Sequence, residues 1–242
     1  MSDNPRYAIY YTPAPEHPLT VAARAWLGRD AFAGCSPMAS GGFVATATNQ
    51  IRGALTRAPR RYGFHATLKA PFRLKKECSV EVLERALRKF VAAWPSCPIG
   101  PLKIDLLGGF FALVPVNPAP TLQGLASCIV EEFDRFRAPL SQVEFQRRLC
   151  SQLNEIETTH LVQWGYPYVF DCFRFHMTLT DRLPAENQPV VRRDLDTVFG
   201  SLLCEDYSAD ALSLFVQEHS GADFVVRSQF ALRGPTLLRE AV

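Results

Sequence analysis

The chain has 242 residues, of which 48% are hydrophobic and 21% charged, and its formal net charge at pH 7 is only +2. These totals are typical of a globular protein that buries a sizeable core, and they exclude a global attraction to nucleic acid or membranes. No apolar run reaches transmembrane length. The seven cysteines are scattered without a C-x-x-C pair and no signal peptide opens the chain, so we expect a cytoplasmic protein.

Hydrophobic periodicity predicts strands mixed with helices along the whole chain. A strand over residues 6–12 precedes a helix over 19–27 that stops at Gly28. Residues 31–59 are small, polar and poorly periodic, which predicts a long loop and a candidate lid. The later predicted elements are a strand over 63–70, a helix over 79–94, a hairpin over 102–107 and 110–116, helices over 121–136 and 142–164, a strand over 169–180, a helix over 189–202 and a hairpin over 212–218 and 224–232.

Nearly the same phrase occurs twice, as HATL starting at His65 and as HMTL starting at His176. Each copy lies in an alternating stretch that predicts a strand, on which side chains two apart share a face. His65 and Thr67 therefore share one polar face, and His176 and Thr178 share another. Two such faces around one pocket supply an acid, a base and hydroxyl donors for a single phosphate.

Cations extend both polar faces, because Lys69 follows Thr67 and Arg174 precedes His176 at the same two-residue spacing. We expect both to contact phosphate. Tyrosines near the motif segments and on the first strand, Tyr7, Tyr62 and Tyr168, are candidates for the rim of the substrate site.

Other site chemistries receive less support from the sequence. A single His-x-Thr would most simply be the polar face of a half-exposed strand, but two matching copies argue against that interpretation. No second histidine lies at metal-ligand spacing and no carboxylate shares the two faces, so we expect neither metal nor cofactor. Neither a G-x-S-x-G nor a G-x-x-x-x-G-K-[ST] motif occurs, and the remaining histidines, His17, His160 and His219, have no partner that the sequence identifies.

The two motif histidines are 111 positions apart, 176 minus 65, which is close to half the chain. We therefore expect one bilobal domain over residues 1–242, with motif-bearing halves near 1–118 and 119–242. Strands mixed with helices and joined by hairpins favour an α+β protein.

The paired H-x-[ST] motifs resemble the signature of the 2H phosphoesterase superfamily, which includes RNA 2′,3′-cyclic phosphodiesterases. Longer phrases are similar to a bacterial branch, DUF1045, described as a phosphonate metabolism protein; they begin at Arg6, Trp26, Arg61, Trp164 and Phe173. The resemblance implies a bilobal, LigT-like α+β fold, in which two antiparallel sheets with outer helices form a central cleft. It also implies that His65, Thr67, His176 and Thr178 are the functional residues. The resemblance is weakest over residues 138–154.

These observations predict a metal-independent phosphodiesterase that hydrolyses a small cyclic or otherwise strained phosphodiester in phosphonate metabolism. One histidine takes a proton from water and the other protonates the leaving alkoxide, but the sequence does not say which is which. Thr67 and Thr178 bind the non-bridging oxygens, and Lys69 with Arg174 offsets their charge.

Two alternatives remain at this stage. The same cleft would serve a non-catalytic protein that binds a nucleotide or phosphorylated metabolite. An RNA end-processing 2′,3′-cyclic phosphodiesterase would require a broad basic surface, which the low net charge does not favour. We therefore expect a small-molecule partner and no membrane partner.

Overall fold

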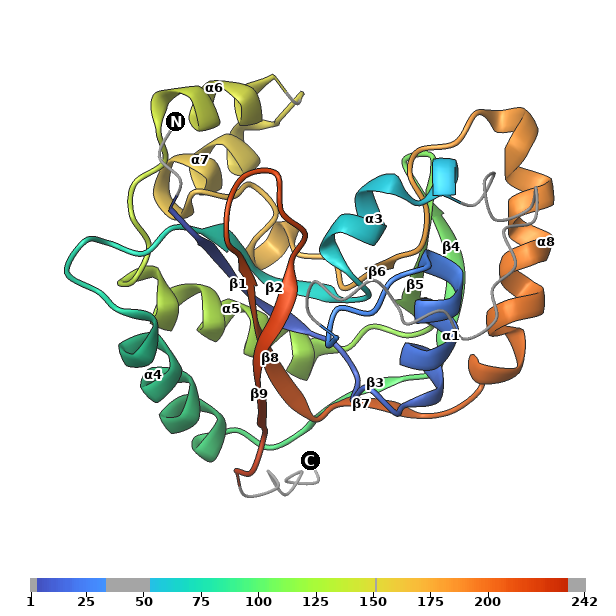
Figure 1. Cartoon of the computed structure of the whole chain (residues 1–242), viewed down its shortest axis with the longest axis horizontal. Coiled ribbons are helices and arrows are strands. Elements are labelled where there is room, and N and C mark those ends of the chain that lie inside the picture. Colours follow the sequence, from blue (N-terminus) through green and yellow to red (C-terminus); the bar gives the residue numbers. More distant parts are fainter. Residues whose placement is uncertain (1–3, 34–52, 151, 235–242) are drawn as a thin grey trace.

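The computed structural model describes residues 4–33, 53–150 and 152–234 (Figure 1). Seven antiparallel strands form the main sheet in the order β4-β5-β6-β2-β1-β8-β9, and β3 pairs with β7 in a second sheet. The strands are β1 (Arg6–Tyr11), β2 (Ala66–Phe72), β3 (Cys97–Gly100), β4 (Leu102–Leu107), β5 (Phe110–Pro115), β6 (Met177–Thr178), β7 (Tyr207–Ala209), β8 (Ala211–Gln217) and β9 (Val225–Ala231).

The predicted α+β class with antiparallel sheets is confirmed, but the strand order does not follow the two halves of the sequence. The first motif strand, β2, lies in a wing with the C-terminal hairpin β8–β9. The second motif strand, β6, pairs instead with β5 of the β4–β5 hairpin. A single residue pair between β2 and β6, Ala66 opposite Met177, joins the two wings into one sheet.

Helices cover the sheet on its core side. Helices α4 (Val80–Ala93) and α5 (Pro120–Asp134) pack on the wing of β2, β8 and β9, and helix α1 (Pro18–Leu27) contacts α8 (Gln188–Phe199) near the other wing (Figure 1). Gly28 ends α1 in the left-handed conformation, as its position predicts. No helix among the described residues is both long and apolar enough to cross a membrane. Core side chains on α4 and α5 include Leu83, Leu87, Leu122, Leu125, Ile129 and Phe133.

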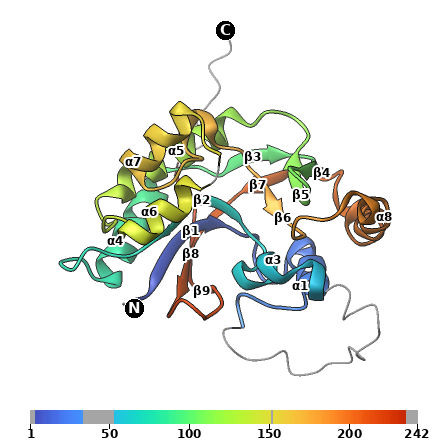
Figure 2. The same ribbon diagram turned by 90° about the horizontal axis from the view of Figure 1, so that it is seen from above.

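The helix predicted over residues 142–164 is two helices, α6 (Gln142–Leu149) and α7 (Glu155–Trp164). Each begins with a capping box, Ser141 with Glu144 and Asn154 with Glu157, in which each side chain bonds the other residue's backbone N–H. A second start signal at Asn154 therefore explains why the helical pattern is interrupted. Figure 2 shows α6 and α7 on the same side of the molecule as α4 and α5.

The strand predicted over residues 169–180 is largely wrong. Only Met177 and Thr178 pair as strand, and a short 3-10 helix occupies Phe170–Cys172, where Phe170 has a φ of 52°. An alternating sequence favours an extended segment, but strand pairing needs a neighbouring strand. Before Met177 no described strand pairs with this segment, while β2 and β5 pair with it at β6 and β5 also bonds Leu179 and Thr180. Most of the candidate lid, residues 34–52, lies outside the described residues.

The predicted position of Lys69 beside His65 and Thr67 is also wrong, because β2 contains a bulge. Tyr10 of β1 pairs with Thr67, but the preceding residue, Ile9, pairs with Lys69. One step along β1 thus corresponds to two steps along β2, which turns Thr67 and Lys69 to opposite faces of the sheet.

Lys69 instead lies under α5, where its side chain is only 4% exposed. Its Nζ donates to Val130 O and to Asp134 Oδ1, both at 3.1 Å, and Arg137 Nε donates to the same carboxylate at 2.7 Å. Burial lowers the pKa of Lys69 to about 8, although the Asp134 carboxylate acts in the opposite direction. Lys69 is therefore part of the buried layer between β2 and α5.

Replacement of Asp134 by Ala should lower the free energy of unfolding by roughly 3–5 kcal/mol, because it leaves the Lys69 amine buried without its counter-ion. Lys69→Met should cost less, since the Asp134 carboxylate keeps its bonds to Arg137. Denaturant unfolding of the two variants and the parent chain measures the difference. A loss below about 1 kcal/mol for Asp134→Ala would mean that the Lys69 amine reaches water.

Candidate functional site

The pairing of β2 with β6 brings the four motif residues together. With Ala66 opposite Met177 in an antiparallel pair, the next positions on either side place His65 opposite Thr178 and Thr67 opposite His176. All four alternate with Ala66 and Met177 and so lie on the other face of the sheet. Directly opposite side chains have Cβ atoms about 4.5–5.5 Å apart, so the four form a compact square.

Backbone geometry fixes the first motif histidine. Gly63 has a φ of 78°, and a Cβ there would lie 2.7 Å from the Cβ of Ala31, so only glycine fits. His65 Nδ1 donates to Gly63 O at 2.9 Å, and Thr67 Oγ1 lies 3.3 Å from His65 Nε2. The His65 ring also stacks on Tyr10, with 3.9 Å between ring centroids.

The second motif repeats this arrangement. His176 Nδ1 donates to the carbonyl of Arg174 at 2.8 Å, again two residues earlier, and the ring lies 6.0 Å from that of Phe110. A carbonyl only accepts, so in both rings Nδ1 carries the proton and Nε2 of the neutral ring is a free base. The two imidazoles therefore present the same nitrogen to the site.

The surroundings of the two rings differ. Burial, chiefly under Tyr10 and near Phe215, lowers the pKa of His65 to about 4; the bond to Gly63 O acts in the opposite direction, and the nearby charge of His176 lowers it further. His65 is thus neutral in the free protein at neutral pH. Only His65 of the two is held under an aromatic stack among the described residues.

A cavity of about 480 Å³ opens over this face of the sheet and is lined by His65, Thr67, Thr178 and Phe110. His176 is not among its lining residues; its ring centroid lies 6.0 Å from that of Phe110. That volume suits a small ligand such as a nucleotide or sugar phosphate. Asp181, just after the second motif, also lines it and accepts from the N–H groups of Arg57 and Ala58 at 3.1 and 2.9 Å. Helix α3 (Arg57–Tyr62), which leads into the first motif, is therefore tied to the second motif.

Three further candidates do not lie where the sequence places them. Arg174 is exposed and lines a separate groove beside Lys103, because the segment before β6 is not paired as a strand. Tyr7 is buried in the main core, on the face of β1 opposite Tyr10. Tyr168 is 44% exposed and does not line the cavity. Tyr62 is at the cavity as predicted, and it stacks on Phe224.

Several cavity residues were not predicted. Tyr10, which the sequence presents as a core residue, is buried but supports His65, and Tyr166 lines the cavity where Tyr168 was expected. The cavity's cations are four arginines from three separate parts of the chain, β1, α6 and the segment after β6. No sequence motif identifies these arginines. For Arg6 a signal was available, because residues 6, 8 and 10 alternate onto one face of β1. The four arginines are Arg6, Arg147, Arg148 and Arg182.

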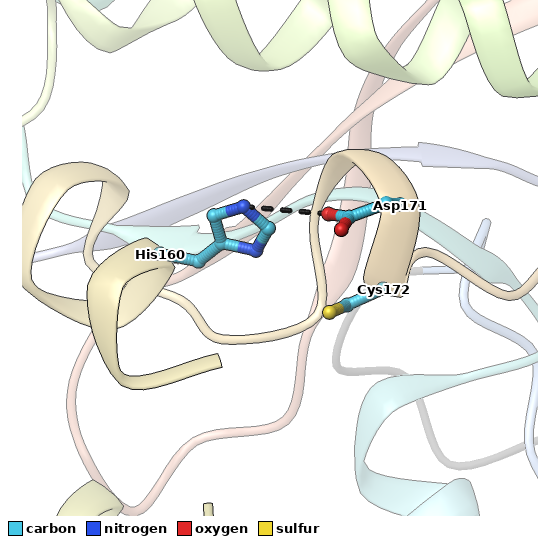
Figure 3. A group of neighbouring side chains, drawn as sticks. All are labelled: His160, Asp171 and Cys172. Carbon is cyan, nitrogen blue, oxygen red and sulfur yellow. Dashed lines mark ion pairs between the residues drawn. The ribbon is translucent and has the colours of Figure 1, made fainter. Parts of the chain in front are cut away.

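A possible metal-binding group lies outside this cavity (Figure 3). Donor atoms of His160, Asp171 and Cys172 all lie within 4.8 Å of one another, a nitrogen, oxygen and sulfur set that Zn²⁺ accepts. His160 Nε2 is 3.4 Å from Asp171 Oδ1, and its Nδ1 is 3.3 Å from Pro167 O. These contacts already close the turn between α7 and the second motif, and none of the three residues lines the histidine cavity.

Two crystal structures of Escherichia coli LigT are similar to this chain at a low level. The complex with NADP⁺ gives a TM-score of 0.41 at 14% identity, covering 96% of this chain and 99% of LigT. The complex with phosphate gives 0.41 at 13% identity, covering 95% and 98%.

Two curated relatives are both named ribose 1,5-bisphosphate phosphokinase PhnN. That of Janthinobacterium sp. (strain Marseille) is 37% identical, covering 91% of this chain and 49% of the relative. That of Laribacter hongkongensis (strain HLHK9) is 32% identical, covering 90% and 50%. The chain thus spans about half the length of the curated relatives it matches.

The family described as "Protein of unknown function (DUF1045)" matches residues 67–225, which include Thr67, His176 and Thr178. This match covers well over half of the 242 residues and agrees with the resemblance seen in the sequence phrases. The chain belongs to the DUF1045 family.

Proposed function

We propose that the chain is a metal-independent phosphodiesterase that hydrolyses a small cyclic or otherwise strained phosphodiester. The observation that carries this proposal is the square of His65, Thr178, Thr67 and His176, three of which line one cavity, with each imidazole oriented by an Nδ1–H bond to a carbonyl two residues earlier. Two bases of one orientation on either side of a phosphorus atom suit an in-line displacement, in which one group removes a proton and the other supplies one.

The unlike surroundings of the rings assign their roles in this proposal. His65, neutral because burial lowers its pKa to about 4, is the base whose Nε2 takes a proton from the attacking water. The water oxygen bonds to phosphorus and the P–O bond to the leaving group breaks. His176 acts as the imidazolium, with a proton on each ring nitrogen, and its Nε2–H protonates the departing alkoxide oxygen. Thr67 and Thr178 donate hydrogen bonds to the non-bridging oxygens. The product is a phosphomonoester with a free hydroxyl.

The curated relatives support a phosphorylated sugar as the class of metabolite and phosphonate metabolism as the setting, since their name refers to ribose 1,5-bisphosphate. Their kinase activity is not assigned to this chain. The chain spans only half of each relative, and its sequence contains no G-x-x-x-x-G-K-[ST] phosphate-binding loop. A hydrolytic reaction at the histidine cavity needs no nucleoside triphosphate.

Replacement of either His65 or His176 by Ala should reduce kcat on a 2′,3′-cyclic nucleotide by roughly 10²–10⁴, the usual contribution of a general acid or base. Steady-state release of the phosphomonoester product measures this. His219→Ala is the matched control, since His219 is exposed and does not line the cavity. Near-parental activity in either motif variant contradicts the proposal, and binding without turnover by the parent chain favours the non-catalytic alternative.

The pH dependence of kcat/KM should reflect the depressed pKa of His65. A base must be neutral to act, so activity should persist as pH falls through 6.5, the ordinary histidine value, and be lost toward pH 4. Titration of the His65 ring by NMR in the free protein gives the same value independently, and a midpoint near 6.5 would contradict the assignment of His65 as the base.

Prolonged treatment with EDTA should leave turnover unchanged. Asp181 is the one carboxylate among the described residues that line the cavity, and its oxygens already accept backbone N–H groups of α3. Activity assays before and after chelation, with metal content measured by mass spectrometry, test this. Activity that disappears with EDTA and returns with added Zn²⁺ or Mg²⁺ would replace the two-histidine mechanism with a metal-assisted one.

A further inference from the structure

Four arginines line the histidine cavity without a carboxylate partner. Arg6, Arg147, Arg148 and Arg182 form no ion pair with any described residue, and the cavity's one aspartate is bound to backbone N–H groups of α3. Eight of the described arginines do pair with a carboxylate, and others outside the cavity, such as Arg85 and Arg193, do not. Arginines that do pair with carboxylates elsewhere are Arg24, Arg29, Arg73, Arg88, Arg135, Arg137, Arg192 and Arg227.

Arg6 is held in place on β1, four residues before Tyr10. Its Nε donates to Gln217 Oε1 at 2.7 Å, and its guanidinium lies 5.5 Å from the centroid of the Phe224 ring. Gln217 is itself fully buried and donates to Ala222 O at 2.7 Å. The Arg6 guanidinium is therefore anchored beside its cross-strand neighbour Gln217.

Arg148 approaches from α6, the segment where the sequence resemblance is weakest. Its guanidinium lies 5.3 Å from the centroid of the Tyr166 ring, and its Nε is buried without a hydrogen-bond partner among the described residues. The nearest acid on its helix, Glu144, is instead bound by Arg73 and by Ser141. Arg147, next in the chain, is exposed at the same cavity. Helix α6 thus contributes two uncompensated positive charges.

The two well-held arginines influence each other and the same tyrosines. Burial lowers the pKa of Arg148 and of Arg6, and for Arg148 the charge of Arg6 lowers it further. Tyr10 interacts electrostatically with both arginines, Tyr62 with Arg6, and Tyr166 with Arg148. Phenolic hydroxyls and guanidinium groups all donate hydrogen bonds to anions, so this end of the cavity is built for negative charge.

The backbone positions of Arg6 and Tyr10 lie well apart on β1. Residues 6, 8 and 10 share one face of β1, with Tyr10 stacked on His65 and Arg6 four residues away. At about 3.3 Å per residue, the two positions are roughly 13 Å apart along the strand, more than one phosphate group can bridge.

We propose that Arg6, Arg147 and Arg148 form a subsite for a second phosphate group on the substrate, a phosphomonoester remote from the bond that is cleaved. This assignment rests on the proposed function for the histidine square. It makes the substrate a phosphodiester that also carries a terminal phosphate, and it makes α6 the element that selects it. Arg148 and Arg6 fix the position of the phosphate oxygens, and Arg147 adds charge at the mouth of the cavity.

Binding to a chain that cannot turn over tests the subsite apart from catalysis. The His65→Ala chain is titrated calorimetrically with adenosine 2′,3′-cyclic phosphate and with the same nucleotide carrying a 5′-phosphate. Charge-assisted hydrogen bonds to the extra phosphate should lower Kd by roughly 10- to 100-fold. Arg148→Gln in this background should abolish most of that difference, Arg148→Lys should retain part of it, and the exposed Arg147→Gln should reduce it without affecting folding.

Arg193→Gln is the matched control, because Arg193 is an exposed arginine on α8 that does not line the cavity, and it should leave the Kd ratio unchanged. Equal Kd values for the two nucleotides overturn the subsite, as does a preference that survives Arg148→Gln or an absence of binding by the 5′-phosphorylated nucleotide. Parallel assays of cleavage by the parent chain test the phosphodiesterase proposal alone. The failure of one proposal can therefore be distinguished from the failure of the other.

Discussion

The pairing of Ala66 with Met177 is the constraint on which the candidate site depends. It is a single residue pair, and among the described residues it is the one strand pairing that joins the two wings of the sheet. It also sets which side chains of the two motifs face each other. Because side chains alternate along a strand, a slip of one residue on one strand would place a motif histidine against the core and an apolar residue in the cavity. Packing on the far side resists such a slip, since both Ala66 and Met177 are fully buried.

The two motifs are matched in bonding and mismatched in surroundings. Each histidine donates Nδ1 to a carbonyl two residues earlier, which is a local property of the phrase itself. The stack of Tyr10 on His65 comes instead from β1, a strand that borders β2 and not β6. A sheet of this order necessarily gives its two central motif strands different neighbours. The repeated phrase therefore yields one ring that stays neutral and one without such cover, and the acid and base of the proposed reaction follow from that difference.

A local irregularity in one strand changes which residues supply positive charge to the cavity. The bulge in β2 turns Lys69 away from the motif face, and its ammonium group forms an ion pair with Asp134 under α5. Positive charge in the cavity comes instead from β1, α6 and the segment after β6, through arginines without acidic partners among the described residues. The proposed phosphate subsite depends on α6, which is positioned by capping residues and by its contacts with α7 and not by either motif. Substrate preference in this chain is thus separable from the chemistry at the histidines.

The sequence by itself determined the features that arise within a few residues of one another. Gly28 ends α1, Gly108 and Gly109 turn the β4–β5 hairpin, and His65 and Thr67 share a face, because helix caps, tight turns and strand alternation are local geometry. Only the tertiary structure decided which strand lies beside which. The bulge before Lys69, the burial of Tyr7, the short β6 and the arrival of Arg148 all depend on partners more than 50 residues away. Such long-range contacts produce no periodic pattern in the sequence. They are fixed by packing and strand pairing across the fold, and local propensity does not determine them.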